Sequence, residues 1–289
     1  MSFTLKQGDE IKLLSKNGNW YEISYNGKSG HAHSKYIFKS QRSIFNKRLF
    51  KPQYQRNVFV FSVLILLFVV FLPICLKIYR REKDKKILKS VTVLNRGTPT
   101  ERDLVLVLLK NGKSVENVYH DLYLNTIDCD FSQIDLVLIT EVGIIVFEVK
   151  DHNGWLYGKG KQEHWTMICG KNKYRIYSPI IQNEVHIKNL RNIINENQDV
   201  PIFSVIVFYG NCNFENINFV PQKTFLTTSN RALEVIKKIE AINPSYGYNN
   251  LAEIRHILQE AKANGDITEN QELHIANIKD MLGTDRKFD

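Results

Sequence analysis

Apolar and polar residues follow three different patterns along the chain, and each pattern predicts a different kind of structure. Residues 1–38 alternate apolar and polar positions around Asn-Gly pairs at 17–18 and 26–27, which predicts several short antiparallel strands. Residues 58–76 are apolar apart from one serine, and a helix rising about 1.5 Å per residue would carry them across roughly 28 Å of hydrocarbon. The later chain holds strand-like and helix-like stretches in turn, so we expect an α/β domain after a transmembrane helix.

The stretch at residues 132–150 holds two runs rich in Ile, Val and Leu, separated by a Glu-Val-Gly break. This pattern predicts a β-hairpin. If the glutamate and valine form a two-residue turn, the numbers of facing residues sum to 283. Asp135 is then expected to face Glu148, and Gln133 is expected to face Lys150.

Side chains alternate across a strand, so these four polar residues should project from one face at one end of the hairpin. The opposite face is expected to be core and carries Ile134, Leu136, Leu138, Ile145, Phe147 and Val149. Two facing carboxylates repel each other by roughly 0.2–1 kcal/mol, and by more where water is excluded. A hard divalent cation between them would remove that conflict, and Lys150 could orient a water or stabilise charge on a phosphate.

This arrangement resembles the core of the PD-(D/E)XK nucleases, with Asp135 as the lone aspartate and Glu148, Val149 and Lys150 as the E-x-K element. Four motifs, in order, resemble the nuclease-related domain family called NERD: GTPTERD at 97–103, QIDLVLIT, GIIVFEVKDHNGWLYG, and SPIIQNEVHIKNL at 178–190. The resemblance covers about residues 90–210. It implies a restriction-endonuclease-like α/β fold, in which a mixed sheet is flanked by helices and the chemistry lies at one sheet edge.

The same resemblance implies a nuclease that hydrolyses phosphodiester bonds of nucleic acid, DNA more than RNA, with Mg²⁺ or Mn²⁺ as its cofactor. The implied catalytic residues are Asp135, Glu148, Lys150, Glu101, Gln133 and Gln182, and the implied metal ligands are Asp135, Glu148 and the Val149 carbonyl. Lys150 would position or activate water. The other polar residues would support the site.

Thr98, Pro99 and Glu101 predict the start of a helix that reaches about Leu109, with threonine as the cap and glutamate in the third position. A capping-box glutamate needs no catalytic role, whereas the resemblance places a glutamate of this helix at the active site. Both interpretations of Glu101 stay open.

Residues 154–177 interleave aromatic rings with basic side chains, which are Lys159, Lys161, Lys171, Lys173 and Arg175. Such a mixture suits a surface that contacts phosphates or unpaired bases of nucleic acid. The alternative is aromatic packing beneath a solvated basic edge.

Ser178 and Pro179 predict the next helix, in which Gln182 and His186 fall on one side. The resemblance places Gln182 near the site, and His186 is interpreted as a supporting polar residue. Further strands are expected at residues 201–209 and 224–228, and amphipathic helices are expected near 231–242, 250–263 and 268–282.

The net charge of +9 is unevenly distributed. Residues 1–56 hold 11 basic and 3 acidic side chains, and residues 77–96 hold 8 and 2, whereas residues 97–289 hold 20 and 25. The basic excess therefore flanks the apolar span, where anionic lipid headgroups are the natural partner. Four cysteines show no C-x-x-C pair, which favours free thiols over a disulfide framework or a zinc site.

The N-terminal glycine, tryptophan and tyrosine spacing resembles a small bacterial SH3-like domain, which implies a cell-wall or protein ligand. The expected segments are an all-β SH3-like domain at 1–40, a basic linker at 41–56, a transmembrane helix at 57–79, a basic juxtamembrane linker at 80–92, and a NERD nuclease-like domain with C-terminal helices at 93–289.

We expect a single-pass protein of the cell membrane with its nuclease domain in the cytoplasm, because residues 77–96 hold eight basic side chains and residues 37–56 hold six. One alternative is a non-catalytic membrane-tethered protein that binds nucleic acid or acts as a scaffold. Another is an envelope protein in which the SH3-like module is the working part. The paired carboxylates beside a lysine favour the enzyme.

Overall fold

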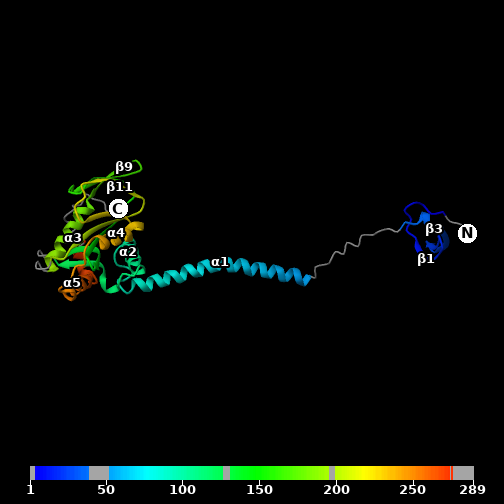
Figure 1. Cartoon of the computed structure of the whole chain (residues 1–289), viewed down its shortest axis with the longest axis horizontal. Helices are drawn as coiled ribbons and strands as arrows, with labels where there is room; N and C mark the ends of the chain where they lie inside the picture. The colour runs from blue at the N-terminus through cyan, green and yellow to red at the C-terminus, as the bar shows by residue number, and fades with distance from the viewer. Residues whose placement is uncertain (1–3, 39–51, 126–130, 195–198, 274, 276–289) are drawn as a thin grey trace. The chain divides into compact units, whose positions relative to one another are not determined.

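The computed structural model describes residues 4–38, 52–125, 131–194, 199–273 and 275. The chain divides into two compact units, Met1–Val70 and Phe71–Asp289, with the boundary inside the long helix α1 (Pro52–Leu88) (Figure 1).

The first unit holds a three-stranded antiparallel sheet in the order β1 (Lys12–Asn17), β2 (Trp20–Tyr25) and β3 (Lys28–His33), followed by the short helix η1 (Ser34–Tyr36). Its second turn is centred on Asn26 and Gly27, as predicted, and both residues have positive φ. The first turn is centred one residue later than expected, on Gly18 and Asn19. Ile23 is the one fully buried side chain among the described residues of this sheet, and the SH3-like assignment stays a prediction.

Helix α1 contains the predicted apolar span and continues through the basic tract to Leu88. Among the described residues, its stretch Arg56–Leu88 is the one helix long and apolar enough to cross a membrane. Beyond the helix, Val91 and Thr92 are already buried in the second unit. The juxtamembrane segment is therefore helical in its first part and packed into the domain in its last part.

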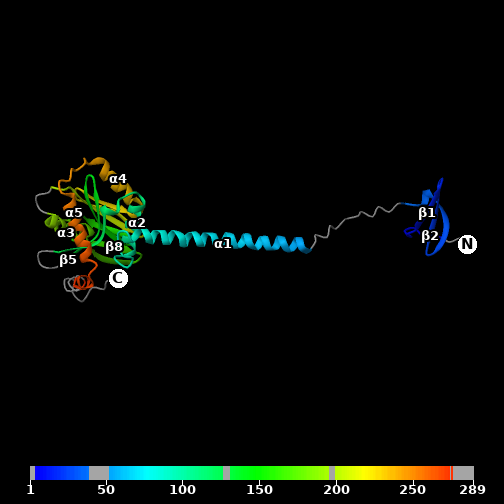
Figure 2. The same cartoon turned by 90° about the horizontal axis from the view of Figure 1, so that it is seen from below.

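The main sheet of the second unit has five strands in the order β12-β10-β6-β5-β4. Figure 2 shows this unit from a second direction. The strands are β4 (Val118–Asn125), β5 (Phe131–Thr140), β6 (Gly143–Asp151), β10 (Ile202–Tyr209) and β12 (Thr224–Thr228). The β4–β5 and β5–β6 pairs are antiparallel, and β10 runs parallel to both β6 and β12. The sheet is mixed, as the sequence predicted.

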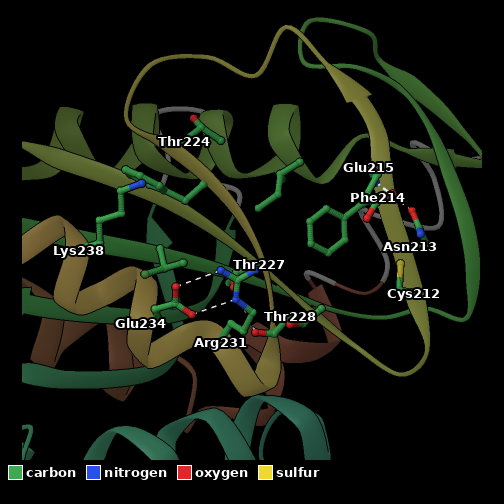
Figure 3. A pocket seen from close by; sticks show the side chains of 13 residues that line it. Cys212, Asn213, Phe214, Glu215, Thr224, Thr227, Thr228, Arg231, Glu234 and Lys238 are labelled. Carbon is green, nitrogen blue, oxygen red and sulfur yellow. Dashed lines mark hydrogen bonds and ion pairs between the residues drawn. The ribbon is translucent and has the colours of Figure 1, made fainter.

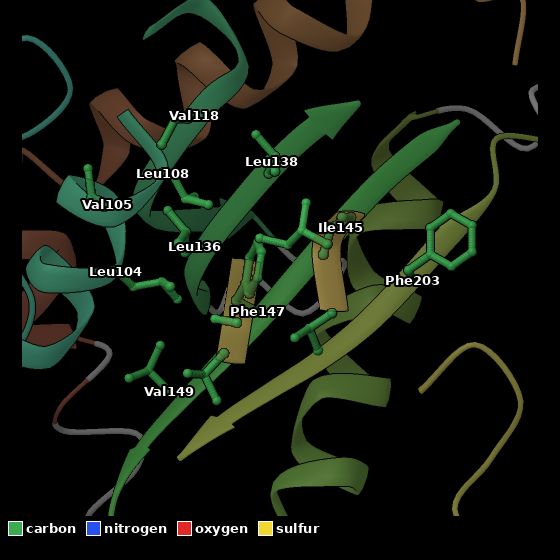
Figure 4. Packing of buried hydrophobic residues seen from close by; sticks show 14 of the residues in the cluster. Leu104, Val105, Leu108, Val118, Leu136, Leu138, Ile145, Phe147, Val149 and Phe203 are labelled. Carbon is green, nitrogen blue, oxygen red and sulfur yellow. The ribbon is translucent and has the colours of Figure 1, made fainter. Parts of the chain in front are cut away.

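Helices cover both faces of this sheet. One core cluster joins β5 and β6 to α2 (Pro99–Lys110) and α4 (Ala232–Ile242), and a second joins them to α3 (Pro179–Ile194) and α5 (Leu251–Asn264). Figure 4 shows Leu104 and Leu108 of α2 directed toward Leu136 and Phe147 of the sheet. The expected core face is confirmed for Leu136, Leu138, Ile145, Phe147 and Val149, and Val137 on the other face is also buried, under α3 and α5.

Residues 154–177 form three strands of a second sheet, in the order β11-β7-β8-β9. Its strands are β7 (Gly154–Lys159), β8 (His164–Cys169), β9 (Asn172–Tyr177) and β11 (Cys212–Asn218). β6 and β10 pair in parallel in the main sheet, and β7 and β11, which follow them in the chain, pair in parallel in the second. The sequence predicted a strand-and-loop surface here but did not predict β11.

Two short helices complete the described elements, η2 (Val115–Asn117) before β4 and η3 (Ser229–Arg231) before α4. The strands expected at 201–209 and 224–228 and the helices expected near 231–242 and 250–263 are present. The last expected helix begins at Thr268, and most of it lies outside the described residues.

Candidate functional site

Asp135 and Glu148 lie on β5 and β6, two inner strands of the main sheet. The sequence placed the chemistry at a sheet edge, and in this respect it was wrong. The predicted register is confirmed from Thr140–Gly143 to Leu136–Phe147. The recorded pairing stops one position before the two acids, and there the Asp135 Oδ2 accepts a hydrogen bond of 2.7 Å from the Val149 N–H. The Asp135 side chain is thereby held against the backbone of the E-x-K segment.

The alternation of side chains breaks at Asp135. Ile134 belongs to the core cluster under α3 and α5, whereas Leu136 belongs to the cluster under α2. Strict alternation would have placed both on one face. The neighbouring strand is distorted at the same level, because Asp121, which the β4–β5 register places opposite Asp135, has a φ of 56°. The two strands reverse their faces together at this point, and their register does not shift.

This reversal separates Gln133 from the two acids. Its side-chain Nε2 donates a hydrogen bond of 2.7 Å to Asp121 Oδ1, and no contact with Glu148 is recorded for it in the described chain. The expectation that Gln133, Asp135, Glu148 and Lys150 project from one face was therefore wrong for Gln133. Gln133 joins the buried Asp121–Arg96 pair instead.

Glu148 is completely buried and lies between two nitrogen-bearing side chains. The Lys150 Nζ is 2.6 Å from its Oε1, and the His186 Nε2 is 3.5 Å from its Oε2. His186 Nδ1 is in turn 3.1 Å from the Ser132 Oγ. Burial acts to raise the pKa of Glu148, but Lys150 and His186 outweigh it and hold the pKa below its ordinary value. His186 is a supporting residue of the site, as the sequence suggested.

Asp135 has the opposite electrostatic environment. Burial, the Glu148 charge and the Glu101 charge together raise the pKa of Asp135 well above its ordinary value. Burial acts to lower the pKa of Lys150, but Glu148 and Asp135 outweigh it and raise that pKa. Of the two acids, Asp135 therefore holds a proton more tightly than Glu148 does, and the neighbouring carboxylates favour the charged form of Lys150. Two carboxyl groups with pKa values pushed apart are a recurring feature of acid-base sites.

Glu101 satisfies its capping role and also adjoins the site. Its N–H donates to the Thr98 Oγ1 at 3.2 Å, and the Thr98 hydroxyl donates to its carboxylate at 2.8 Å. The His120 Nε2 lies 3.4 Å from its other oxygen. Burial acts to raise the Glu101 pKa, but His120 and Thr98 outweigh it and lower that pKa. Gly97, at a φ of 60°, leaves no room for a Cβ above Glu101 and His120.

Two buried groups of this region were missed in the sequence. His120 lies on β4 with no exposed surface, and its Nδ1 is 2.8 Å from the Thr92 Oγ1. Arg96 donates to Asp121 Oδ2 at 2.9 Å and to Asp266 Oδ1 at 2.6 Å. The signal that could have found them is the run of polar residues inside an otherwise apolar strand, since a buried polar group needs a partner.

Gln182 lies in the first turns of α3, one turn before His186, so the two share a side of the helix. Its backbone N–H donates to the Ser178 carbonyl at 3.0 Å. The neighbouring Asn183 is the buried anchor of this helix, donating to the Val146 carbonyl at 3.0 Å and to Ser204 Oγ at 2.8 Å. Asn183 therefore fixes α3 against β6, with His186 above Glu148.

The predicted nucleic-acid-binding side chains all lie on the second sheet or its turns and are exposed: Lys159, Lys161, Lys171, Lys173 and Arg175. Trp165 is buried in a core cluster with Leu156 and Phe208, so for this ring the packing interpretation holds. Trp155 is 49% exposed. Packed aromatic residues therefore lie on one face of the sheet, and the exposed surface that the nucleic-acid interpretation requires lies on the other.

The donor set fits a hard divalent cation. Both Glu148 oxygens are buried next to charged partners, yet neither makes a hydrogen bond of good geometry, so lone pairs remain. In the part of the chain that the structure describes, no group of three or more His, Cys, Asp and Glu side chains converges on a single point. Two carboxylates with a backbone carbonyl still suit Mg²⁺, which keeps several waters and binds through one or two carboxylates.

A hollow of about 620 Å³ lies away from these acids, between β11, β12 and α4 (Figure 3). Phe214 and Glu215 line it from β11, and Glu234 and Lys238 line it from α4. The Arg231 Nε and the Glu234 Oε2 pair across its floor at 3.0 Å. None of the predicted catalytic residues lines this hollow.

Residues 96–209 match the sequence model of the NERD family, the nuclease-related domain, so the predicted resemblance is confirmed for this part of the chain. An uncharacterized protein of Bacillus anthracis is 31% identical over 123 residues, which are 43% of this chain and 57% of that protein. The chain thus spans little more than half the length of this relative. No solved structure matches the chain significantly.

Proposed function

We propose that the nuclease-related domain at residues 96–209 makes this chain a membrane-anchored, metal-dependent nuclease that hydrolyses phosphodiester bonds of nucleic acid. DNA is the favoured substrate. The observation that carries the proposal is the buried Glu148 carboxylate, with the Lys150 Nζ held 2.6 Å from one of its oxygens and the half-buried Asp135 beside it. Such a pair is costly unless a cation or a reaction uses it.

Asp135 and Glu148, with the Val149 carbonyl, would hold Mg²⁺ or Mn²⁺. When bound, the ion supplies a Lewis acid for the phosphate and lowers the pKa of a coordinated water. The Val149 N–H fixes one oxygen of Asp135, so the carboxylate keeps its orientation. His186 performs the same task for Glu148 and is itself oriented by Ser132.

Lys150 acts as a cation in this scheme. Because neighbouring charges raise its pKa, it holds its proton at neutral pH and does not serve as the general base. Its side chain is 24% exposed, so the ammonium can orient a water or stabilise negative charge on a phosphate at the surface of the site. Glu101 contributes a nearby negative charge and is oriented by His120.

The test is cleavage by the purified full-length chain in detergent, using labelled single- and double-stranded substrates with Mg²⁺, Mn²⁺ or chelator. The expected result is cleavage that chelator abolishes and that Glu148→Gln lacks. Substrate binding without any metal-dependent cleavage would replace the nuclease by the non-catalytic binding protein.

The membrane arrangement belongs to the same proposal. We place the nuclease domain in the cytoplasm and the N-terminal unit outside, because the basic excess after the span is the larger one. In a chain without its native cysteines, a new cysteine at Ser40, which lies outside the described residues, should label from outside with an impermeant reagent. A cysteine at the exposed Ser90 should not label. Labelling at position 90 in intact cells would reverse the assignment.

A further inference from the structure

One face of the second sheet presents aromatic and basic side chains to solvent. We call it the aromatic-basic face and define it by Trp155, Tyr157, Lys159, Lys173, Arg175 and Tyr177. The three rings are 49%, 38% and 41% exposed. Large rings left this exposed on a single sheet face gain little for the stability of the core and mark a contact surface.

The other face of the same sheet accounts for the core. Leu156, between the two exposed rings of β7, is fully buried with Trp165 and Ile217. A Cβ on Gly158 would collide with the Trp165 ring, so the inner face is closely filled. The alternation along β7 therefore leaves Trp155 and Tyr157 outside a core that is already complete.

The strand register places Trp155 and Tyr157 each in one row with a cation. Trp155 lies opposite Ile168, and Ile168 lies opposite Lys173, so these three residues form one row across β7, β8 and β9. Tyr157, Thr166 and Arg175 form the next row in the same way. Within a row the ring and the cation are two strands apart, about 10 Å at the usual strand spacing.

The charge of this region is opposite to that of its domain. Residues 154–177 carry five Lys or Arg and one acidic side chain, whereas residues 97–289 as a whole carry 20 basic and 25 acidic ones. The acidic majority would repel a polyphosphate over most of the surface. The positive charge of the aromatic-basic face is complementary to the negative charge of a polyphosphate. A hollow of about 620 Å³ beside Lys173 and Arg175 adds depth at β8 and β9.

We propose that the aromatic-basic face binds an unpaired nucleic-acid strand, with bases stacked on Trp155 and Tyr157 and phosphates on Lys173 and Arg175. This inference rests on the proposed nuclease and names its substrate class as single-stranded nucleic acid. Duplex bases have both faces covered by their neighbours, so exposed rings can stack only on unpaired bases. The two rows are about 7 Å apart along β7, twice the 3.4 Å rise of a stacked strand, which also requires bases that have left the stack.

The aromatic-basic face lies close enough to the carboxylates for one nucleic-acid strand to contact both. Trp155 follows Lys150 by five residues, so their Cα atoms are within about 18 Å of each other even if the chain is fully extended. A strand held on the second sheet therefore reaches the carboxyl-terminal end of β6 within a few nucleotides.

The experiment measures binding of the full-length chain in detergent to a fluorescein-labelled, unstructured oligonucleotide and to a duplex of equal length, with chelator present to prevent cleavage. The expected result is at least tenfold tighter binding of the single strand. Trp155→Ala and Tyr157→Ala should each weaken single-strand binding about tenfold and leave duplex binding nearly unchanged. Trp155→Phe should retain most of the affinity, and Tyr36→Ala, an exposed ring of the first unit, serves as the control.

The outcomes separate this inference from the nuclease. Equal affinity for the two forms, or a Trp155→Ala chain that binds like the wild type, would overturn the aromatic-basic face while leaving metal-dependent cleavage intact. Ring-dependent single-strand binding without metal-dependent cleavage would support the face and remove the nuclease. Unchanged unfolding temperatures of the variants would show that the exposed substitutions leave the fold intact.

Discussion

In both sheets of the second unit, successive side chains of a strand point to opposite faces, but the sheets differ in how far those faces are covered. The main sheet is covered by helices on both faces, and it holds the buried Glu148 beside the half-buried Asp135. The second sheet is covered on one face only and leaves rings and cations in solvent. Burial strengthens interactions between charges and shifts pKa values, whereas exposure leaves surface free to contact a partner. In the proposed account, the main sheet carries the chemistry and the second sheet carries recognition.

The largest effect should come from the buried acid of the main sheet. Glu148→Gln keeps the volume but removes the charge, so we expect metal binding to fail and cleavage to fall by at least about 10³-fold. It also leaves Lys150 and His186 without their shared anion, which should cost about 1–3 kcal/mol of unfolding free energy. Steady-state cleavage and denaturant unfolding measure the two losses, and normal turnover by this variant would remove the proposed site.

The lysine beside that acid sharpens the comparison further. Lys150→Met should retain Mn²⁺ binding, because the carboxylates remain, but should lower turnover by about 10²–10³-fold. Calorimetric Mn²⁺ titration and single-turnover cleavage provide the two readouts. Loss of metal binding together with turnover would show that Lys150 only holds the acids in place.

Substitutions on the second sheet should change binding and its salt dependence. Neutralising Lys171, Lys173 and Arg175 together removes three phosphate contacts, so the slope of log affinity against log salt should fall by about 2 for a single strand. Lys237→Gln with Lys238→Gln, which removes two charges from α4, is the control. An unchanged slope in the triple variant would return these side chains to a merely solvated edge.

The smallest effect is on stability as a function of pH. The raised pKa of Asp135 means that, between its unfolded and folded values, the folded chain holds more protons than the unfolded chain. The stability of the wild type should therefore fall as pH rises through that window in chelator. Asp135→Asn should abolish this fall and be more stable by about 1 kcal/mol or more at alkaline pH. A wild-type chain whose stability relative to Asp135→Asn increases with pH would contradict the raised pKa of Asp135.

The hairpin was predictable because two constraints agree on it. Continuous apolar runs favour strands, and a two-residue turn fixes the register, so the pairs from Thr140–Gly143 to Leu136–Phe147 follow from arithmetic. The extrapolation to Gln133 failed because the chain reverses its faces at Asp121 and Asp135. Such a reversal depends on the backbone conformation of two neighbouring strands, which alternation within one strand does not record.

The supporting groups of the site were less predictable for a related reason. Glu101 of helix α2 was found through its capping pattern, but its partner His120 lies on strand β4, 19 positions later in the chain. Arg96 and Asp266 meet although they are 170 positions apart. Such pairs are set by tertiary packing. The aromatic-basic face was half predicted, since the composition was visible but the face of each ring required the register of three strands.

The most direct test of the division between the two sheets is a comparison of kcat and KM for single-strand cleavage by Glu148→Gln and Trp155→Ala. The account predicts that Glu148→Gln lowers kcat, so that saturating substrate does not restore its rate. It also predicts that Trp155→Ala raises KM about tenfold and recovers the wild-type rate at saturation. A Trp155→Ala chain that loses kcat without a change in KM, or a Glu148→Gln chain whose rate recovers at high substrate, would contradict it.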